Sequence, residues 1–313
     1  MIRTPITYVW QNADGDTLGK VRTIASLSPS LKDMPLWRFD GGSTGQAEVD
    51  KSDCILKPVR LYRGVGTYVL CEVLDSNGLA HKSNYRRELE RLQDADKNSV
   101  LMGIEQEFIF TKIKGEKIDL YQPPNSYCTA DNQGRDVVAT HMYRCFGLNL
   151  PYYGNNAEVT PQQWEYQLGT EKPLELADAL VLSRWLLKEI CPQGTKVSFD
   201  PKPFPGVNGS GAHINISTLA TRSCKMDLSV LAEKFRHCHE EHMDAYGKDN
   251  YKRMLGVYET ASFDEFTIGV GARNASIRIP DGIESQTYIE DRRPAANVNP
   301  YRAFARIMQT LES

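Results

Sequence analysis

Acidic residues in this sequence recur at a spacing of two, the spacing that places side chains on one face of a β-strand. Glu105 and Glu107 share a face in a first segment, and Glu165 lies two residues from both Gln163 and Gln167 in a second segment. The opposite faces are apolar or aromatic. Three further segments follow the same design, with polar faces that carry His213, Asn215 and Ser217, then Arg278, then Glu290 and Arg292.

A polar strand face is most often the solvated side of an antiparallel sheet. Two features favour a cavity instead. The polar faces of these five segments carry no lysine. Carboxylates two residues apart lie about 6–7 Å from each other on a strand, and they repel unless a cation lies between them. We therefore expect a sheet that is curved around a charged cavity.

Several carboxylates with a single imidazole favour a hard divalent ion, Mg²⁺ or Mn²⁺, over zinc. Arginines beside them suit phosphate and carboxylate groups, because a planar guanidinium binds both in a bidentate way. No Ser/His/Asp or Cys/His nucleophile is evident in the sequence. The combination favours phosphoryl transfer, in which the protein mainly positions groups and offsets charge.

Other motifs indicate less. The glycine-rich segment 205–211 lacks the Lys-Ser or Lys-Thr of a phosphate-binding Walker loop, and by itself it is typical of a turn. His239 and His242 lie three residues apart on an expected helix, with His237 nearby. Zinc proteases use a spacing of four, so we expect structural or surface roles for these histidines.

Hydrophobic periodicity predicts a mixed α+β fold. Residues 7–10, 20–24 and 67–73 are expected strands, and a turn at 75–78 precedes a helix that Asn84 begins. We place a domain boundary there, between residues 1–83 and 84–313. Helices are expected in the second part at residues 136–146, 174–190, 231–246 and 300–311.

Composition limits the class of protein. The chain has 313 residues, 41% of them hydrophobic, and a formal net charge of −3, which argues against disorder and against a general nucleic-acid binder. We expect no membrane segment, and residues 1–6 lack the apolar stretch of a signal peptide. Seven cysteines without a C-x-x-C pair favour reduced thiols and a cytoplasmic location.

Longer motifs carry a family resemblance over nearly the whole chain. The sequence resembles the glutamine synthetases of the shorter, eukaryotic-like (type II) branch. The matching motifs, in family order, are WRFDGGST (37–44), MGIEQEF (102–108), NAEVTPQQWEYQLG (156–169), FDPKPFPGVNGSGAHINIS (199–217), YETASFDEFTIGVGARNASIRIP (258–280) and YIEDRRPAANVNPY (288–301).

The resemblance implies a small β-grasp-like N-terminal domain, followed by a catalytic domain with a curved antiparallel sheet flanked by helices. It also implies a ring-shaped homo-oligomer with active sites between subunits. The implied reaction consumes ATP. The side-chain carboxylate of L-glutamate takes the γ-phosphoryl group, and ammonia, which arrives as ammonium, then displaces phosphate to form glutamine.

Site residues follow from the same resemblance, motif by motif. Two or more Mg²⁺ or Mn²⁺ ions would be held by Glu105, Glu158, Glu165, His213 and Glu290. Glu158 and Glu165 would serve one ion with a partner from the segment of Glu105 and Glu107, and His213 and Glu290 a second. The implied catalytic residues are Asp40, which would take a proton from ammonium, Glu259 on a closing flap, and Arg292. The implied substrate-binding residues are Glu107, Asn208, Gly209, Arg253, Arg273 and Arg278, and Ser217 and Arg278 would lie toward the nucleotide.

This sequence departs from the family pattern in three shortened segments, 60–68, 122–134 and 281–287, and in Tyr258, where histidine is common. Two alternatives to a glutamate–ammonia ligase stay open. One is a γ-glutamyl ligase for a larger amine. The other is a non-catalytic binding protein of the family, which would be expected to have lost metal-site carboxylates; none is lost here.

Overall fold

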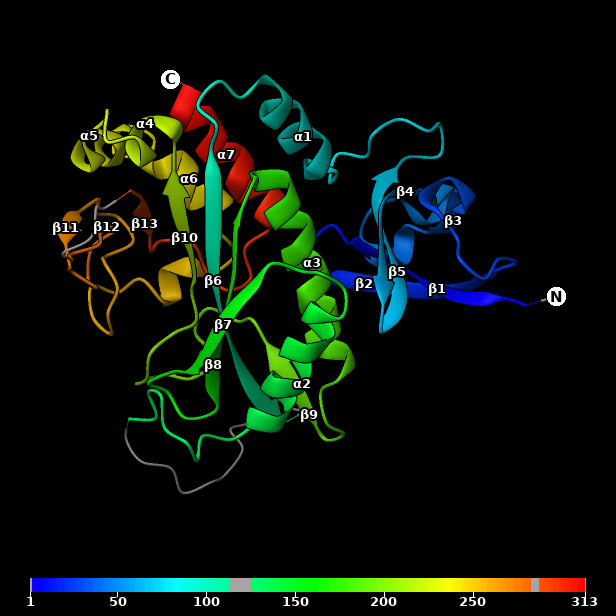
Figure 1. Ribbon diagram of the computed structural model, residues 1–313, viewed down its shortest axis with the longest axis horizontal. Helices are drawn as coiled ribbons and strands as arrows, with labels where there is room; N and C mark the ends of the chain where they lie inside the picture. Colours follow the sequence, from blue (N-terminus) through cyan, green and yellow to red (C-terminus); the bar gives the residue numbers. More distant parts are fainter. Residues whose placement is uncertain (1, 113–124, 283–286, 313) are drawn as a thin grey trace.

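The computed structural model describes residues 2–112, 125–282 and 287–312, and it contains two β-sheets with helices packed around them (Figure 1). The first sheet is built before residue 75 and the second after residue 100. This arrangement confirms the expected α+β class. Parts of the shortened segments 122–134 and 281–287 lie outside the described residues.

The first sheet has five strands in the order β2-β1-β5-β4-β3. β1 and β5 run parallel, and the other neighbours are antiparallel. The three strands expected in this part are confirmed, whereas its β-grasp-like character and the boundary at residue 83 stay predictions. The strands are β1 (Thr4–Gln11), β2 (Thr17–Ile24), β3 (Trp37–Asp40), β4 (Asp53–Gly64) and β5 (Gly66–Leu74).

The second sheet has eight strands in the order β11-β12-β13-β10-β6-β8-β7, with β9 paired to the far end of β6. All neighbours are antiparallel except β11 and β12. All five segments expected from the alternation of polar and apolar residues are strands. The strands are β6 (Leu101–Lys112), β7 (Tyr152–Ala157), β8 (Gln163–Glu171), β9 (Thr195–Ser198), β10 (Ala212–Ser217), β11 (Ile268–Val270), β12 (Ile277–Ile279) and β13 (Ile289–Asp291).

Seven α-helices and four 3-10 turns are described. The expected helices at 136–146, 174–190 and 300–311 are confirmed within a residue or two at each end. The helices are α1 (Tyr85–Ala95), α2 (Arg135–Phe146), α3 (Pro173–Glu189), α4 (Leu219–Arg222), α5 (Leu228–Lys234), α6 (His239–Ala245) and α7 (Pro300–Glu312). The 3-10 turns are η1 (Leu31–Asp33), η2 (Gly42–Thr44), η3 (Val49–Lys51) and η4 (Asn250–Lys252).

The single helix expected over 231–246 is wrong, because α5 and α6 are separated by a tight turn. In that turn Phe235 and Arg236 donate backbone hydrogen bonds three residues back, not four. The rings of Phe235 and His242 lie 5.1 Å apart. Residues seven apart along a straight helix are separated by about 10.5 Å. The break lets both rings enter one buried cluster.

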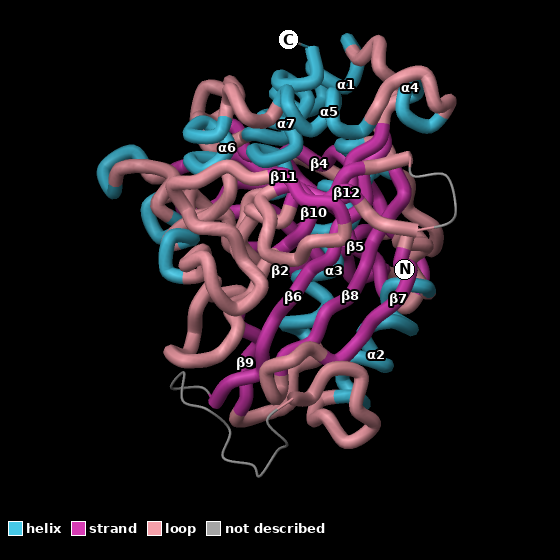
Figure 2. The backbone as a smooth tube through the Cα atoms, turned by 90° about the vertical axis from the view of Figure 1, so that its left-hand side faces the viewer, coloured by secondary structure: helices cyan, strands magenta, loops and turns pink. Residues whose placement is uncertain are grey.

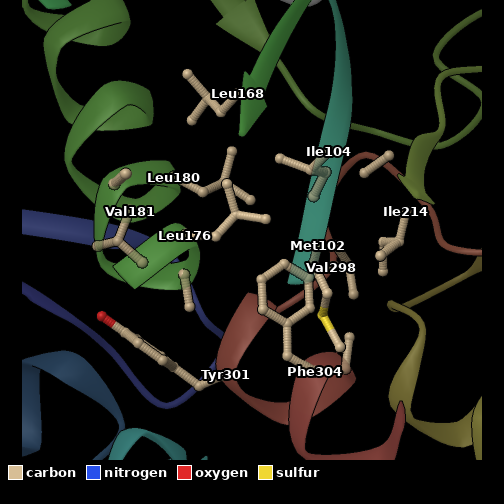
Figure 3. Close-up of a cluster of buried hydrophobic side chains, with 14 of the residues drawn as sticks. Met102, Ile104, Leu168, Leu176, Leu180, Val181, Ile214, Val298, Tyr301 and Phe304 are labelled. Carbon is tan, nitrogen blue, oxygen red and sulfur yellow. The ribbon is translucent and has the colours of Figure 1, made fainter. Parts of the chain in front are cut away.

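The apolar faces of the second sheet pack on helices α3 and α7 (Figure 3). Ile104 from β6 and Ile214 from β10 are buried there, next to Leu176 and Leu180 of α3. Because successive residues of a strand point to opposite faces, this burial turns the intervening polar residues away from the helices. Figure 2 shows β10, β6, β8 and β7 side by side on that other face, with loops around them.

Helix α3 contacts both sheets, and its buried Asp178 joins three elements. Arg86 of α1 donates two hydrogen bonds of 2.9 Å to this carboxylate. Tyr301 of α7 donates a third at 2.8 Å, and Arg60 of β4 lies 3.3 Å away. Since a buried charge is costly unless it is paired, these contacts fix α3 against its neighbours. Among the described residues, no helix is both long and apolar enough to cross a membrane.

Candidate active site

The polar face of the second sheet forms the floor of a cavity of about 450 Å³. Strands β6, β7, β8, β10, β12 and β13 contribute side chains to it, as do residues of adjoining loops. The sequence-predicted residues that line it are Glu105, Glu107, Glu158, Glu165, His213, Glu259, Arg273, Arg278, Glu290 and Arg292. The structure therefore brings together acid, imidazole and guanidinium groups that are far apart in the chain.

Strand register explains why these side chains meet. His213 lies directly opposite Glu105, and Glu107 lies opposite Glu165. Arg278 lies opposite Glu290 at the other side of the sheet. Directly opposite residues of neighbouring strands have their Cβ atoms about 4.5–5.5 Å apart on the same face. Alternation within each strand and register between strands together create the cluster.

The imidazole of His213 lies at the centre of the acidic groups. Its Nδ1 is 3.5 Å from a carboxylate oxygen of Glu105 and 3.7 Å from one of Glu290, and its Nε2 is 3.8 Å from Glu107. One potential ligand atom from each of Glu105, Glu165 and His213 lies within 4.8 Å of the others. This group contains Glu165 from one expected ligand set and His213 from the other, so ligands expected for two ions lie in one cavity.

Burial and mutual repulsion change the proton affinities of these groups. Burial, and then the charge of Glu105, raises the pKa of Glu165 well above its usual value. Burial raises the pKa of Glu158 to about 7, and burial together with the charge of Glu158 raises the pKa of Glu107 to about 8. Burial, reinforced by Arg292, lowers the pKa of His213 well below its usual value, so the ring is neutral and able to bind a metal.

The donor set fits a hard divalent cation. Crowded carboxylates with raised pKa values are a costly arrangement, and a cation between them removes that cost by favouring their ionised forms. A neutral imidazole adds one nitrogen ligand to the oxygen ligands. Glu105, Glu165 and His213 can therefore hold an ion, with Glu107, Glu158 and Glu290 around them.

Two arginines hold Glu290 from both sides. Arg278 donates a hydrogen bond of 2.7 Å to one of its oxygens, and Arg292 donates one of 2.5 Å to the other. Arg292 also donates to the backbone carbonyl of Arg273 at 2.9 Å. The buried Nε of Arg278 has no hydrogen-bond partner among the residues that the structure describes, which leaves a donor for a ligand oxygen.

Glu107 connects the cavity to the glycine-rich loop. The backbone N–H of Gly211 donates to it at 2.8 Å, and the side-chain amide of Gln163 donates to it at 3.0 Å. The same amide group donates to the carbonyl of Gly209 at 2.8 Å. Gly209 and its neighbour Asn208 are thus held behind Glu107, outside the lining of the cavity.

Three further predicted residues lie outside the cavity lining. Arg253 is buried, and it donates hydrogen bonds to the backbone carbonyls of residues 292, 293 and 294, so it supports the strand end that carries Arg292. Ser217 is buried and accepts a hydrogen bond of 2.9 Å from Arg222. Asp40 is exposed at the end of β3 in the first sheet, where a hydrogen bond from the Ser43 hydroxyl lowers its pKa.

Four residues that the sequence did not single out also line the cavity: Asn125, Tyr127, Asn156 and Val159. Asn156 lies on β7 opposite Glu165, and it donates a hydrogen bond of 2.8 Å to Glu158. Asn156 lies on the same face of the sheet as Glu165, one strand away. It could have been predicted as a lining residue if the pairing register of β7 and β8 had been known. Asn125 and Tyr127 come from a loop, where no periodic pattern applies.

Comparison with known proteins identifies relatives of this arrangement. Residues 81–311 match the family model of the glutamine synthetase catalytic domain. The chain is 39% identical to the glutamine synthetase of Emericella nidulans, over 97% of this chain and 91% of the relative. Its identity to the enzyme of Colletotrichum gloeosporioides is also 39%, over 97% and 90%. For Panulirus argus the identity is 37%, over 97% and 91%.

Solved structures share the fold. A ligand-free GmaS structure superposes with a TM-score of 0.77 at 20% identity and covers 98% of this chain and 76% of that chain. The Plasmodium falciparum glutamine synthetase superposes with a TM-score of 0.78 at 18% identity, over 98% and 71%.

Proposed function

The chain belongs to the glutamine synthetase family, and from that premise we propose that it ligates ammonia to the side-chain carboxylate of L-glutamate. ATP would phosphorylate this carboxylate, and ammonia would then displace phosphate, giving glutamine, ADP and phosphate. The observation that carries the proposal is the single cavity in which the acidic, imidazole and guanidinium groups of five strands and adjoining loops meet. Phosphoryl transfer needs such a site, since positioning and charge stabilisation provide most of its catalysis.

We assign the metal site to Glu105, Glu158, Glu165, His213 and Glu290, with two or more Mg²⁺ or Mn²⁺ ions. The short distances among Glu105, Glu165 and His213 support this assignment, as do the raised pKa values of Glu158 and Glu165. Bound divalent ions would offset the charge of the transferring phosphoryl group.

The guanidinium groups would bind the anionic ends of the substrates. Arg278, whose Nε has no partner among the described residues, and Arg292 would contact phosphate oxygens, and Arg273 or Arg292 would contact the carboxylate of glutamate. Glu107, Asn208 and Gly209 would bind the rest of glutamate, and Arg253 would act by holding their surroundings in place. Ser217 would lie toward the nucleotide through its position at the end of β10.

Two acidic residues would serve the ammonia end. Glu259 lines the cavity and can attract ammonium. Asp40 is exposed and lies outside that lining, which supports a ring-shaped homo-oligomer in which each cavity receives Asp40 from a neighbouring subunit. The hydrogen bond from the Ser43 hydroxyl lowers the pKa of Asp40, so the carboxylate is ionised and can attract ammonium, whose proton it would take.

We further propose that residues 1–83 and 84–313 are separate domains, since the family match begins at residue 81. Seven free cysteines support a cytoplasmic location.

The decisive experiment supplies ATP, L-glutamate and Mg²⁺ to the purified protein, first with ammonium and then with a series of larger amines. We expect ADP and glutamine in equal amounts with ammonium. Turnover only with a larger amine would show that this amine, and not ammonia, is the substrate. Mg²⁺-dependent ATP binding without turnover of any amine would instead indicate a binding protein.

A further inference from the structure

A short hairpin at residues 255–262 forms the wall of the cavity that carries Glu259. Leu255 and Ser262 form a β-bridge at its base. The hydroxyl of Thr260 donates a hydrogen bond of 2.9 Å to the carbonyl of Val257 and so closes the tip. The hairpin is therefore bonded internally at its base and near its tip.

The tip of this hairpin has an unusual backbone. Tyr258 has φ of 57° and Glu259 has φ of 62°, so two successive non-glycine residues are left-handed. Such conformations cost energy, and they persist where the surroundings hold them. The two residues have different contacts: Glu259 lines the cavity, and the ring of Tyr258 lies against a lysine of another loop.

That lysine is Lys202. Its Nζ lies 4.4 Å from the centre of the Tyr258 ring, within the range of a cation–π contact. The same Nζ donates a hydrogen bond to the carbonyl of Val207. A second contact comes from Arg292, whose Nη2 donates a hydrogen bond of 3.4 Å to the carbonyl oxygen of Glu259. Lys202 thus joins the hairpin tip to the glycine-rich loop.

The glycine-rich loop is itself tied to the cavity. The backbone N–H of Ser210 donates to the carbonyl of Pro201 at 2.9 Å, which closes the loop around Lys202. Gln163 then links Gly209 and Ser210 of this loop to Glu107. Lys202 therefore lies between two walls of one site, the wall assigned to glutamate and the wall assigned to ammonia.

We propose that Lys202 and Tyr258 are positioning residues for the amine step, because their contact fixes the carboxylate of Glu259 relative to the loop that holds Asn208 and Gly209. This role rests on the proposed function. Neither residue lines the cavity, so both act through Glu259.

A displaced Glu259 would slow the capture of ammonia while the first step continued. Water would then add to the γ-carbonyl carbon of the acyl phosphate, and the bond from that carbon to the phosphate oxygen would break. The proton of the attacking water would pass to solvent. Glutamate and phosphate would leave, with ADP already formed and no glutamine made. Loss of positioning should therefore lower the ratio of glutamine formed to ADP formed.

The test compares K202M, Y258L and the double variant with the conservative variants K202R and Y258F. K252M is the matched control, since Lys252 also lies near a tyrosine ring, at 5.8 Å from Tyr251, but on the η4 turn. Glutamine and ADP are both measured while ammonium is varied. We expect K202M and Y258L each to raise KM for ammonium about two- to fivefold, because a change of that size corresponds to the free energy of a partly exposed cation–π contact.

The same two variants should also form less glutamine per ADP, with KM for ATP unchanged. The double variant should be no worse than either single variant, and K202R, Y258F and K252M should behave as the wild type. If Y258L fails to fold, the comparison of K202M with K202R decides.

Unchanged product ratios in K202M and Y258L, or losses that add in the double variant, would overturn the positioning role. Equal loss in K202R and K202M would do the same. A wild-type protein that makes no glutamine would instead contradict the proposed function, so the two failures are distinguishable.

Discussion

Glu165→Gln should make the metal-free protein more stable while it removes activity. Glutamine has nearly the same shape as glutamate, and its side-chain oxygen can still accept the hydrogen bond that Gln167 donates to Glu165. The substitution therefore removes little but the negative charge. In a cluster that we propose to bind cations, the negative charge of Glu165 destabilises the protein when no cation is bound and is required for binding one.

The magnitude follows from the geometry. The nearest carboxylate oxygens of Glu165 and Glu105 lie within 4.8 Å. Two negative charges at that distance repel by about 3 kcal/mol at an effective dielectric constant of about 20. Burial and this repulsion both raise the pKa of Glu165 in the folded protein. The folded state then binds the proton more tightly than the unfolded state, so stability falls as pH rises from the unfolded pKa of about 4.3 toward the folded value.

Glutamine has no proton to lose in that window. We therefore expect Glu165→Gln to raise the free energy of unfolding by about 2–3 kcal/mol at pH 8, with a smaller gain at pH 6. Urea unfolding in EDTA at both pH values measures this gain. Mg²⁺ should stabilise the wild type more than the variant. Glu165→Gln should lower turnover by more than the roughly 10–100-fold that is typical when a residue hydrogen-bonded to a metal ligand is substituted.

The control is Glu241→Gln, which changes an exposed glutamate on α6 away from the cavity, and it should alter neither stability nor turnover appreciably. A Glu165→Gln protein that is less stable than the wild type in EDTA at pH 8 would refute the repulsion argument. A variant with near-normal turnover in saturating Mg²⁺ would refute the metal assignment.

Three other substitutions test separate parts of the structure. Asp40→Asn should still allow ADP formation with glutamate but slow glutamine formation, with the mass in solution unchanged; equal loss of both steps would contradict a base role. Asp178→Ala leaves the buried guanidinium of Arg86 without its carboxylate, and urea unfolding should show a loss of about 3–5 kcal/mol. Gly209→Ala would place a methyl group 2.3 Å from the carbonyl oxygen of Pro201, so the loop must shift. KM for glutamate should therefore rise, with KM for ATP little changed. An unaltered KM for glutamate would contradict the proposed role of this loop in binding glutamate.

The sequence predicted which residues share a face, because the period of a strand depends on local geometry alone. It therefore predicted that Glu105 and Glu107 lie together, and that His213 lies opposite the buried side of its strand. It could not predict register, which depends on contacts between distant segments. The close approach of Glu165 and His213, whose potential ligand atoms lie within 4.8 Å, therefore became visible only in the structure.

Irregular segments were less accessible to pattern analysis. The helix expected over 231–246 has suitable periodicity, but the packing of Phe235 on His242 requires a break that no local signal shows. Tyr127 reaches the cavity from a loop whose path depends on the whole fold. In the proposed ring-shaped oligomer, subunit assembly sets the position of Asp40 relative to a cavity, and no periodic pattern in the sequence of one chain encodes that assembly.

The absence of lysine from the polar strand faces now has a physical explanation. Four carboxylates of the cavity are oriented by neutral amide groups. A side-chain amide can fix the direction of a carboxylate oxygen without cancelling its charge, whereas an ammonium group would compete with a bound cation for it. Glu290 differs from these four, because two arginines hold it, and there the guanidinium groups themselves suit an anionic substrate. The amide pairs are Asn215 with Glu105, Gln163 with Glu107, Asn156 with Glu158 and Gln167 with Glu165.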